Sequence, residues 1–204
     1  MPSITELPCE IVAIILSSLD HPRDLLPALL TCHHFYMSFK ESHGVAASIL
    51  RQQITPALLP VAVAVMEASR LPRPFVDTAV LGLLDELYRS PARLAARVSA
   101  LPLLVVQKMS RIHDAVHALA TDFGARAQAR ISHLTTITAV SPTEYFRFCR
   151  ALYRVELFYA IFQHGDFDDK IKPWFLWKHQ LWENEQIASA YEYLEERFVQ
   201  GEYA

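Results

Sequence analysis

The motif Ser-Pro-Thr-Glu that begins at Ser141 marks the start of a helix more clearly than any other part of the chain. A serine that caps the first turn, a proline at the first helical position and a glutamate three residues after the serine together form a capping box. The residues that follow, up to His164, are apolar almost all round the predicted helix. A helix of this kind has to be surrounded by other elements. The motif therefore predicts a central buried helix and a fold in which helices pack on helices.

Most of the chain after Gly44 shows the same helical periodicity. The other helices expected in this part are residues 45–54, 57–70, 77–88, 91–102, 103–124 and a last one from Glu183. Gly124 is expected to end its helix as a C-terminal cap. The last helix is expected to carry Ile187, Tyr191, Leu194 and Phe198 on one face. The predicted class is all-α, with short N-terminal helices followed by a bundle-like body.

Composition restricts the class of protein further. Of 204 residues, 52% are hydrophobic and 20% are charged, which is ample for a core and unlike a disordered chain. The net charge of −3 gives no electrostatic reason to expect binding to nucleic acid or to an anionic membrane. The longest apolar run, Ile54 to Met66, has 13 residues, whereas a membrane helix needs about 20. With three unpaired cysteines and no signal-peptide pattern, we expect a soluble cytoplasmic or nuclear protein.

The first forty residues predict two short amphipathic helices. Pro8 falls in the first turn of one helix, where a missing N–H costs nothing. Asp24 is expected to cap the second helix, which runs on to Tyr36. Two helices of about ten residues are marginal alone, and these carry more leucine and isoleucine than they can bury between them. Periodicity leaves open whether the rest of the chain or a partner covers the remaining surface.

This segment resembles the F-box, the helical motif that docks a substrate receptor onto a cullin-type ubiquitin ligase through a small Skp-family adaptor. The resemblance covers residues 4–43. The matching positions are Leu7, Pro8, Glu10, Ile11, Leu16, Leu19, Asp24, Leu25, Leu29, Cys32 and Phe35. The chain departs from the usual pattern where His33 and His34 replace a basic pair and where Thr31 replaces a small aliphatic residue. The apolar docking face is retained.

The resemblance implies an F-box over residues 1–44 and a helical body over residues 45–204. It also implies a Skp-family adaptor and a cullin ligase as partners, with a protein substrate that the sequence does not identify. The residues expected to bind the adaptor are Leu7, Pro8, Ile11, Ile15, Leu16, Leu19, Leu25 and Leu29. The body is similar to that of large fungal F-box families, whose members are usually longer, so we expect the natural protein to extend past residue 204.

Aromatic residues are concentrated in the C-terminal part of the chain. From Tyr145 onward they are dense, and all three tryptophans lie there. Two interpretations stay open: a bulky core, or a recognition surface for a substrate. Trp174 and Trp177 are the candidate substrate-binding residues, because they follow an acidic loop over residues 166–170 and because tryptophan is common at interface hot spots.

Motifs for metal binding or catalysis are weak. His113 and His117 have the spacing of a metalloprotease helix, but Asp114 stands where the general base glutamate belongs, and no third ligand is evident. We find no glycine-rich phosphate loop, nucleophile elbow or CxxC pair in the sequence. We therefore expect no metal, no cofactor and no intrinsic catalysis.

Three functions are consistent with these patterns. The first is a substrate receptor of an SCF-type ubiquitin ligase, which would hold a target near the conjugating enzyme without performing chemistry itself. The second is an F-box-containing interaction module that acts outside a ligase. The third is a helical protein that binds a small molecule through its aromatic end.

Overall fold

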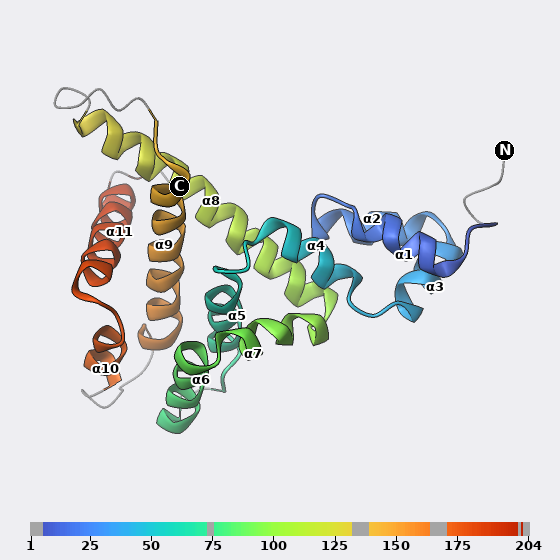
Figure 1. Cartoon of the computed structure of the whole chain (residues 1–204), viewed down its shortest axis with the longest axis horizontal. Helices are drawn as coiled ribbons and strands as arrows, with labels where there is room; N and C mark the ends of the chain where they lie inside the picture. The colour runs from blue at the N-terminus through green and yellow to red at the C-terminus, as the bar shows by residue number, and fades with distance from the viewer. Residues whose placement is uncertain (1–5, 73–75, 132–138, 164–170, 200, 202–204) are drawn as a thin grey trace. The chain divides into compact units, whose positions relative to one another are not determined.

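All regular elements that the computed structural model describes are helices, as the sequence predicted (Figure 1). The structure describes residues 6–72, 76–131, 139–163, 171–199 and 201. In chain order the elements are α1 (Cys9–Ser17), α2 (Pro22–Thr31), α3 (His33–Glu41), α4 (Val45–Gln53), α5 (Leu59–Ala68), α6 (Asp77–Arg89), α7 (Pro91–Ala96), the 3-10 helix η2 (Arg97–Ala100), α8 (Leu103–Ile131), α9 (Pro142–Phe162), α10 (Ile171–Trp177) and α11 (Leu181–Val199). Among the described residues, none of the helices combines the length and the apolar character needed to cross a membrane.

The chain divides into two compact units, which we describe separately. The N-terminal unit comprises residues 1–63 and 92–113, and the C-terminal unit comprises residues 64–91 and 114–204. The F-box motif predicted over residues 1–44 lies within the N-terminal unit, which also includes α4 and the first part of α8. The functional boundary at residue 44 stays a prediction.

The start of α2 differs from the prediction. Pro22 is the first helical residue and His21 the N-cap, so Asp24 lies in the first turn instead of capping the helix. The carboxylate of Asp24 still carries its charge at the positive end of the helix dipole. Proline at the first helical position fixes φ in the helical range and gives up no internal hydrogen bond, which explains why the helix begins three residues earlier.

The segment predicted to be one helix up to Tyr36 forms two helices. Cys32 is extended, with φ −156° and ψ 154°, and it separates α2 from α3. Just before this break, the hydroxyl of Thr31 donates to the carbonyl of Ala28 at 2.7 Å. The N-terminal motif therefore contains three short helices. After α3, Gly44 adopts φ 87° as the N-cap of α4, a left-handed conformation that glycine adopts at little cost.

The capping box at the start of α9 is present, as predicted. Ser141 is the N-cap, and its Oγ accepts a hydrogen bond from the N–H of Glu144 at 3.2 Å. In return, Oε2 of Glu144 accepts one from the N–H of Ser141 at 2.9 Å. The hydrogen bonds from Ser141 also lower the pKa of Glu144. The buried residues of α9 are Cys149, Ala151, Leu152, Tyr153, Val155, Leu157, Ile161 and Phe162, which confirms a largely buried helix.

Gly124 does not end its helix. α8 continues through this glycine to Ile131. A Cβ added at Gly124 would lie 3.1 Å from Cγ2 of Val140 and 3.4 Å from the ring of Phe148 on α9. The missing side chain therefore allows α8 to approach the start of α9 closely, and the signal interpreted as a cap reflects packing between helices.

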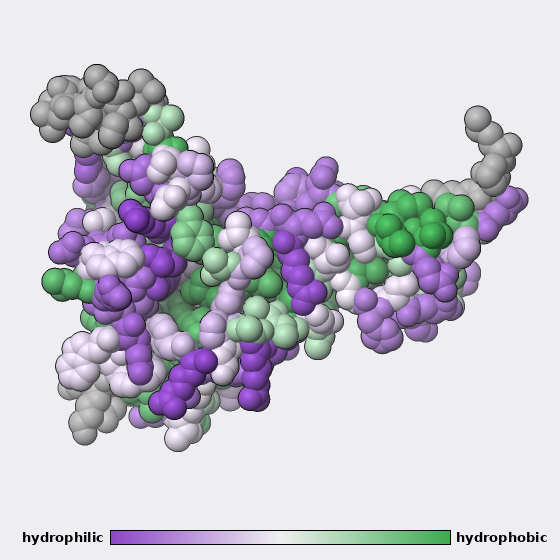
Figure 2. Space-filling model, viewed as in Figure 1, coloured by the Kyte–Doolittle hydropathy of each residue, from purple (hydrophilic) through white to green (hydrophobic). Residues whose placement is uncertain are grey.

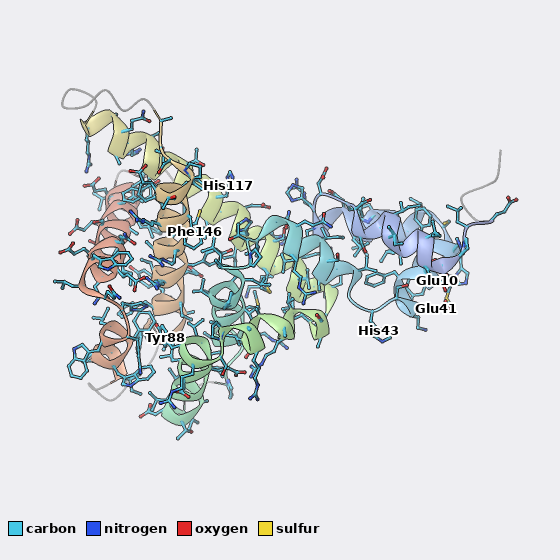
Figure 3. All side chains as sticks on the ribbon, in the orientation of Figure 1. Glu10, Glu41, His43, Tyr88, His117 and Phe146 are labelled. Carbon is cyan, nitrogen blue, oxygen red and sulfur yellow. The ribbon has the colours of Figure 1, made fainter. Side chains whose placement is uncertain are left out.

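A polar cluster holds the arginines of α9 inside the C-terminal unit. Oε1 of Glu183 lies 3.1 Å from Nη2 of Arg150 and 3.1 Å from Nη1 of Arg154. Nearby, Tyr88 projects from α6 toward α10, and its hydroxyl is hydrogen-bonded to Nε2 of His179 at 3.0 Å (Figure 3). Burial, helped by the positive charge of Arg154, lowers the pKa of His179 to about 4, so this imidazole is neutral. The cluster pairs the main charges that α9 carries into the unit.

The four residues of α11 that share one face in the sequence pattern are not equally buried. Ile187 is buried, and Tyr191 stacks on Tyr159 of α9 with ring centroids 5.9 Å apart. Phe198, however, is 78% exposed, whereas Ala190 and Tyr193 are buried. This side of α11 is therefore buried near the middle of the helix and open to solvent in its last turn.

We expect the substitution Ser141→Ala to lower the free energy of unfolding by about 1 kcal/mol, because it removes the side-chain cap of α9. Chemical denaturation of the full chain measures this change. Thr143→Ala is the matched control, since Thr143 is exposed in the same turn and is expected to change stability by less than about 0.5 kcal/mol. Equal effects of the two substitutions would contradict the importance of the cap.

Two glycines inside helices should respond differently to alanine. Gly82 in α6 has no atom within 4 Å of an added Cβ, so Gly82→Ala should stabilise the protein by about 0.5–1 kcal/mol. Gly124→Ala should gain less, because Val140 has to move to make room. Denaturation midpoints of the two variants compare the effects directly. A larger gain at position 124 than at position 82 would disprove the close approach of α8 and α9.

Candidate functional site

The first helix of the chain is apolar on two sides. Val12, Ala13 and Leu16 are buried in the N-terminal unit. Ile14, on another side of the helix, is 65% exposed, and Ile11 and Ile15 are exposed beside it. Because these three isoleucines have the spacing i, i+3 and i+4, they form a continuous stripe on α1. A surface helix of a globular protein typically carries polar residues on the side that faces solvent.

The next two helices extend this stripe into a surface. On α2, Leu30 is 77% exposed and Leu26 is exposed one turn earlier, while Tyr36 of α3 adds an exposed aromatic ring. Figure 2 shows hydrophobic side chains gathered over the N-terminal helices. We call this set the N-terminal apolar surface; it consists of Ile11, Ile14, Ile15, Leu26, Leu30 and Tyr36. Large apolar side chains gathered in this way are typical of a protein interaction site.

A histidine fixes the approach of the chain to α1. Nε2 of His34 on α3 donates a hydrogen bond to the backbone carbonyl of Leu7 at 2.9 Å. This bond ties the residues before α1 to α3, so the start of the motif is held by the middle of the motif. His34 is one of the two histidines that depart from the F-box pattern, and here it has a structural role.

Three glutamines hold the loop between α1 and α2. Nε2 of Gln52 donates to the carbonyl of Ser17 at 2.9 Å, and Nε2 of Gln53 donates to that of Asp20 at 3.1 Å. Nε2 of Gln107 on α8 donates to the carbonyl of Pro22 at 3.2 Å. These amides come from outside the F-box motif, and sequence analysis missed them. An isolated glutamine has no characteristic spacing, so the sequence contains no signal that would have identified them.

One further contact supports the same loop. The hydroxyl of Ser110 donates to Oε1 of Gln53 at 2.9 Å, and Nε2 of Gln53 also contacts Nδ1 of His21. Every polar atom of the Gln53 amide is therefore engaged, which fixes the orientation of this side chain. The loop that joins α1 to α2, two of the helices that carry the N-terminal apolar surface, is thus held through its backbone by side chains of α4 and α8.

The structure divides the eight residues predicted to bind an adaptor into three groups. Pro8, Ile11 and Ile15 are exposed, and Leu7 and Leu19 are half-buried. The remaining three, Leu16, Leu25 and Leu29, are buried and pack in the core of the N-terminal unit. These three can support a binding surface but expose little area to a partner. Contact between any of the eight residues and an adaptor stays a prediction.

The two tryptophans proposed for substrate binding have different surroundings. Trp174 is half-buried, meets the ring of Tyr88 edge-on at 6.2 Å, and has Nζ of Lys178 4.5 Å from its ring centroid. Trp177 is 82% exposed. The acidic loop over residues 166–170 lies outside the described residues. Trp177 is therefore available to a partner, whereas Trp174 mainly packs against its own unit.

The described residues offer no group of three or more His, Cys, Asp or Glu side chains that could hold a metal ion. The ring of His117 packs edge-on against that of Tyr145, with the ring centroids 5.5 Å apart. Comparisons with protein-family models, with curated proteins and with solved structures find no match to this chain. The function therefore has to be inferred from the site itself.

Substitutions on the buried and on the exposed side of the N-terminal helices should have different effects on stability. Leu25→Ala, at a fully buried position, should cost about 2–5 kcal/mol of unfolding free energy through the cavity it leaves. Ile14→Ala should change stability by less than about 0.5 kcal/mol, because its side chain is exposed. Chemical denaturation of both variants tests the assignment. A large cost for Ile14→Ala would show that this isoleucine is covered within the chain.

Proposed function

We propose that the chain is a substrate-recognition subunit of an SCF-type cullin ubiquitin ligase and that its N-terminal helices dock a Skp-family adaptor. The observation that carries this proposal is the N-terminal apolar surface. It lies within the segment that resembles an F-box, and its leucines and isoleucines are exposed in the chain alone. Burying such side chains against a partner is favourable by about 25 cal/mol for each Å² of apolar area removed from water.

The arrangement of the loop supports the same proposal. A docking surface binds more tightly when it is already ordered, because less conformational entropy is lost on association. The amides of Gln52, Gln53 and Gln107 hold the α1–α2 loop through its backbone, and His34 holds the residues before α1. The parts of the N-terminal apolar surface that lie on α1 and α2 are thus joined by a loop whose backbone is held in place before a partner binds.

In this role the chain would contribute proximity instead of chemistry. The adaptor would hold the N-terminal helices, and the remaining surfaces would hold a protein substrate near a conjugating enzyme carried by the ligase. Trp177 is one proposed contact for that substrate, because it is a large exposed aromatic residue outside the adaptor-binding segment. The exposed aliphatic residues Leu176 and Leu181 flank it in sequence.

The variant Ile14→Ala with Leu30→Ala tests the docking surface. Truncating two exposed anchors should weaken adaptor binding by about 2 kcal/mol or more while leaving the fold intact. Titration of the purified chain with a Skp-family adaptor, followed by calorimetry, measures the loss. Leu104→Ala is the matched control, because Leu104 is also an exposed leucine but lies outside the motif.

Unchanged adaptor affinity in the double variant would reject this surface. Co-purification from cells then distinguishes the wider alternatives. Recovery of both adaptor and cullin supports the ligase subunit, recovery of the adaptor alone supports an interaction module that acts outside a ligase, and recovery of neither overturns the proposal.

A further inference from the structure

The C-terminal unit contains an open groove of about 630 Å³ that the proposed adaptor surface does not include. It is formed by residues of α8, α9 and α11, with Ser69 at its margin. This volume is within the range of about 300–1,000 Å³ that is usual for ligand sites. We call it the acidic groove, because the charged residues that line it, Glu156 and Glu195, are acidic.

The floor of the acidic groove is largely apolar. Its apolar lining residues are Leu119, Tyr159, Ala160, Leu194 and Phe198. Phe198 lies one turn after Leu194 on α11 and is 78% exposed, so much of its ring remains uncovered. The stacked rings of Tyr159 and Tyr191 join α9 to α11 beside this floor. The groove therefore offers apolar area that is accessible from solvent and held between packed helices.

The charged residues of the lining are both acidic. Glu156 comes from α9 and Glu195 from α11, and the described lining contains no lysine or arginine. Glu195 accepts a hydrogen bond from the hydroxyl of Tyr191, and this bond raises the pKa of Tyr191. The bond orients the carboxylate of Glu195 and leaves it acceptor capacity for a further donor. A neighbouring hollow shares Glu195 and adds Glu192, Val199 and Glu196, of which Glu196 is paired with Arg130, so acidic and apolar residues continue along α11.

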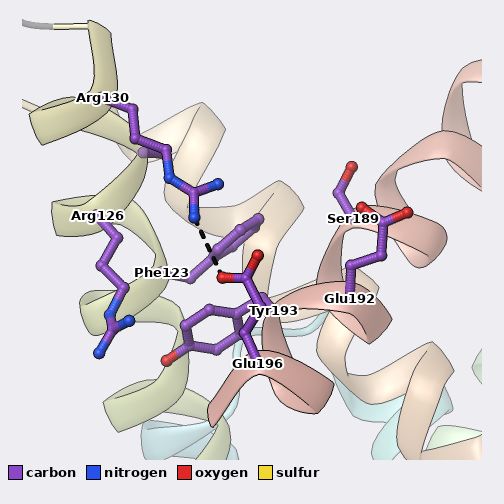
Figure 4. Close-up of a pocket in the computed structure, with 8 residues that line it drawn as sticks. Phe123, Arg126, Arg130, Ser189, Glu192, Tyr193 and Glu196 are labelled. Atoms are coloured by element: carbon purple, nitrogen blue, oxygen red, sulfur yellow. Dashed lines mark hydrogen bonds and ion pairs between the residues drawn. The ribbon is translucent and has the colours of Figure 1, made fainter. Parts of the chain in front are cut away.

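A second hollow of the same unit provides a contrast. It has a volume of about 300 Å³ and is lined by residues of α8 and α11 (Figure 4). Its arginines are already paired: Nη2 of Arg130 lies 3.1 Å from Oε2 of Glu196, and Nε of Arg126 lies 3.0 Å from Oδ2 of Asp122. This hollow presents balanced charge and gives no indication of a ligand, whereas the described residues that line the acidic groove carry one sign of charge beside apolar side chains.

We propose that the acidic groove binds a basic amphipathic peptide segment of a partner protein. Aliphatic side chains of the segment would cover Leu194 and Phe198, and a lysine or arginine would pair with the carboxylates of Glu156 and Glu195. An apolar centre with a charged margin is the usual composition of a protein-binding site, and an amphipathic segment in a groove is a recurring mode of peptide recognition. Complementary charge would select basic segments over acidic ones.

The inference is separate from adaptor docking. If the chain is the receptor proposed above, the acidic groove is a place where it would hold its target, in addition to the contact proposed for Trp177. Peptide binding is measured on the chain alone, without an adaptor. A negative peptide result with normal adaptor binding would therefore reject the groove and leave the proposed function standing.

The probe is a fluorescein-labelled amphipathic peptide of leucine and lysine, and its binding to the full chain is followed by fluorescence anisotropy. Matched peptides carry glutamine or glutamate in place of lysine. The lysine peptide should bind most tightly and the glutamate peptide least. Affinity for the lysine peptide should fall as salt is added, because ion pairs near the surface are screened. Equal affinity for the lysine and glutamate peptides would overturn the proposal.

Two variants locate the binding. Glu156→Gln with Glu195→Gln keeps the shape of both side chains and should weaken binding of the lysine peptide about tenfold, with little change for the glutamine peptide. Its control is Glu41→Gln with Glu185→Gln, which removes the same charge at exposed positions that do not line the groove. An equal loss in both double variants would indicate attraction to the net negative charge alone and would overturn the proposal.

The variant Phe198→Ala tests the apolar part and should weaken both the lysine and the glutamine peptide about tenfold. Because Phe198 is exposed, this substitution should leave the fold intact, which thermal melting by circular dichroism verifies. Leu104→Ala, another exposed apolar truncation, is the control and should bind normally. Binding of Phe198→Ala with wild-type affinity would reject the groove as the site.

Discussion

The packing of the C-terminal unit depends on the need to cover the apolar residues of α9, eight of which are buried. Its apolar residues cannot be satisfied by one neighbour, so several helices of the unit pack around it. Two local features make this packing possible. Glu183 places one carboxylate between Arg150 and Arg154, so that the charges of α9 are paired inside the unit. Gly124 removes a side chain where α8 would otherwise press against Phe148. The capping box then fixes where the central helix begins.

The N-terminal helices face the opposite problem, because α1 has more apolar surface than its unit covers. One side of α1 completes the core with α3 and α4, and the other leaves three isoleucines in water. Retaining such a surface in a folded chain is unfavourable unless a partner covers it for part of the time. The same short helix therefore serves folding with one side and, in our proposal, association with the other. The buried residues Leu16 and Leu25 contribute by holding the exposed ones in register.

Much of the fold could be predicted from sequence, and the errors have different causes. The class, most helices and the cap at Ser141 depend on local patterns, which sequence contains directly. The continuation of α8 through Gly124 depends on packing against α9, which local propensity does not encode. The start of α2 at Pro22 follows a local signal, which was assigned to Asp24 instead. For the candidate site, sequence reasoning named the segment that carries the N-terminal apolar surface, but only Ile11 and Ile15 of the residues that form it. Ile14 and Leu30 were missed. An isoleucine or leucine in a short helix predicts a buried side chain, but it does not tell whether the chain itself or a partner covers that side chain.

The glutamines beneath the α1–α2 loop have a consequence for how such a chain can vary over evolution. Gln52, Gln53 and Gln107 hold the loop through carbonyl oxygens, which every amino acid provides. The side chains of Ser18 and Leu19 can therefore be exchanged without losing those bonds, whereas exchange of a glutamine removes one. In an alignment of related sequences, the conserved positions that define this loop would lie in α4 and α8, far from the loop in sequence, and the loop itself would look dispensable.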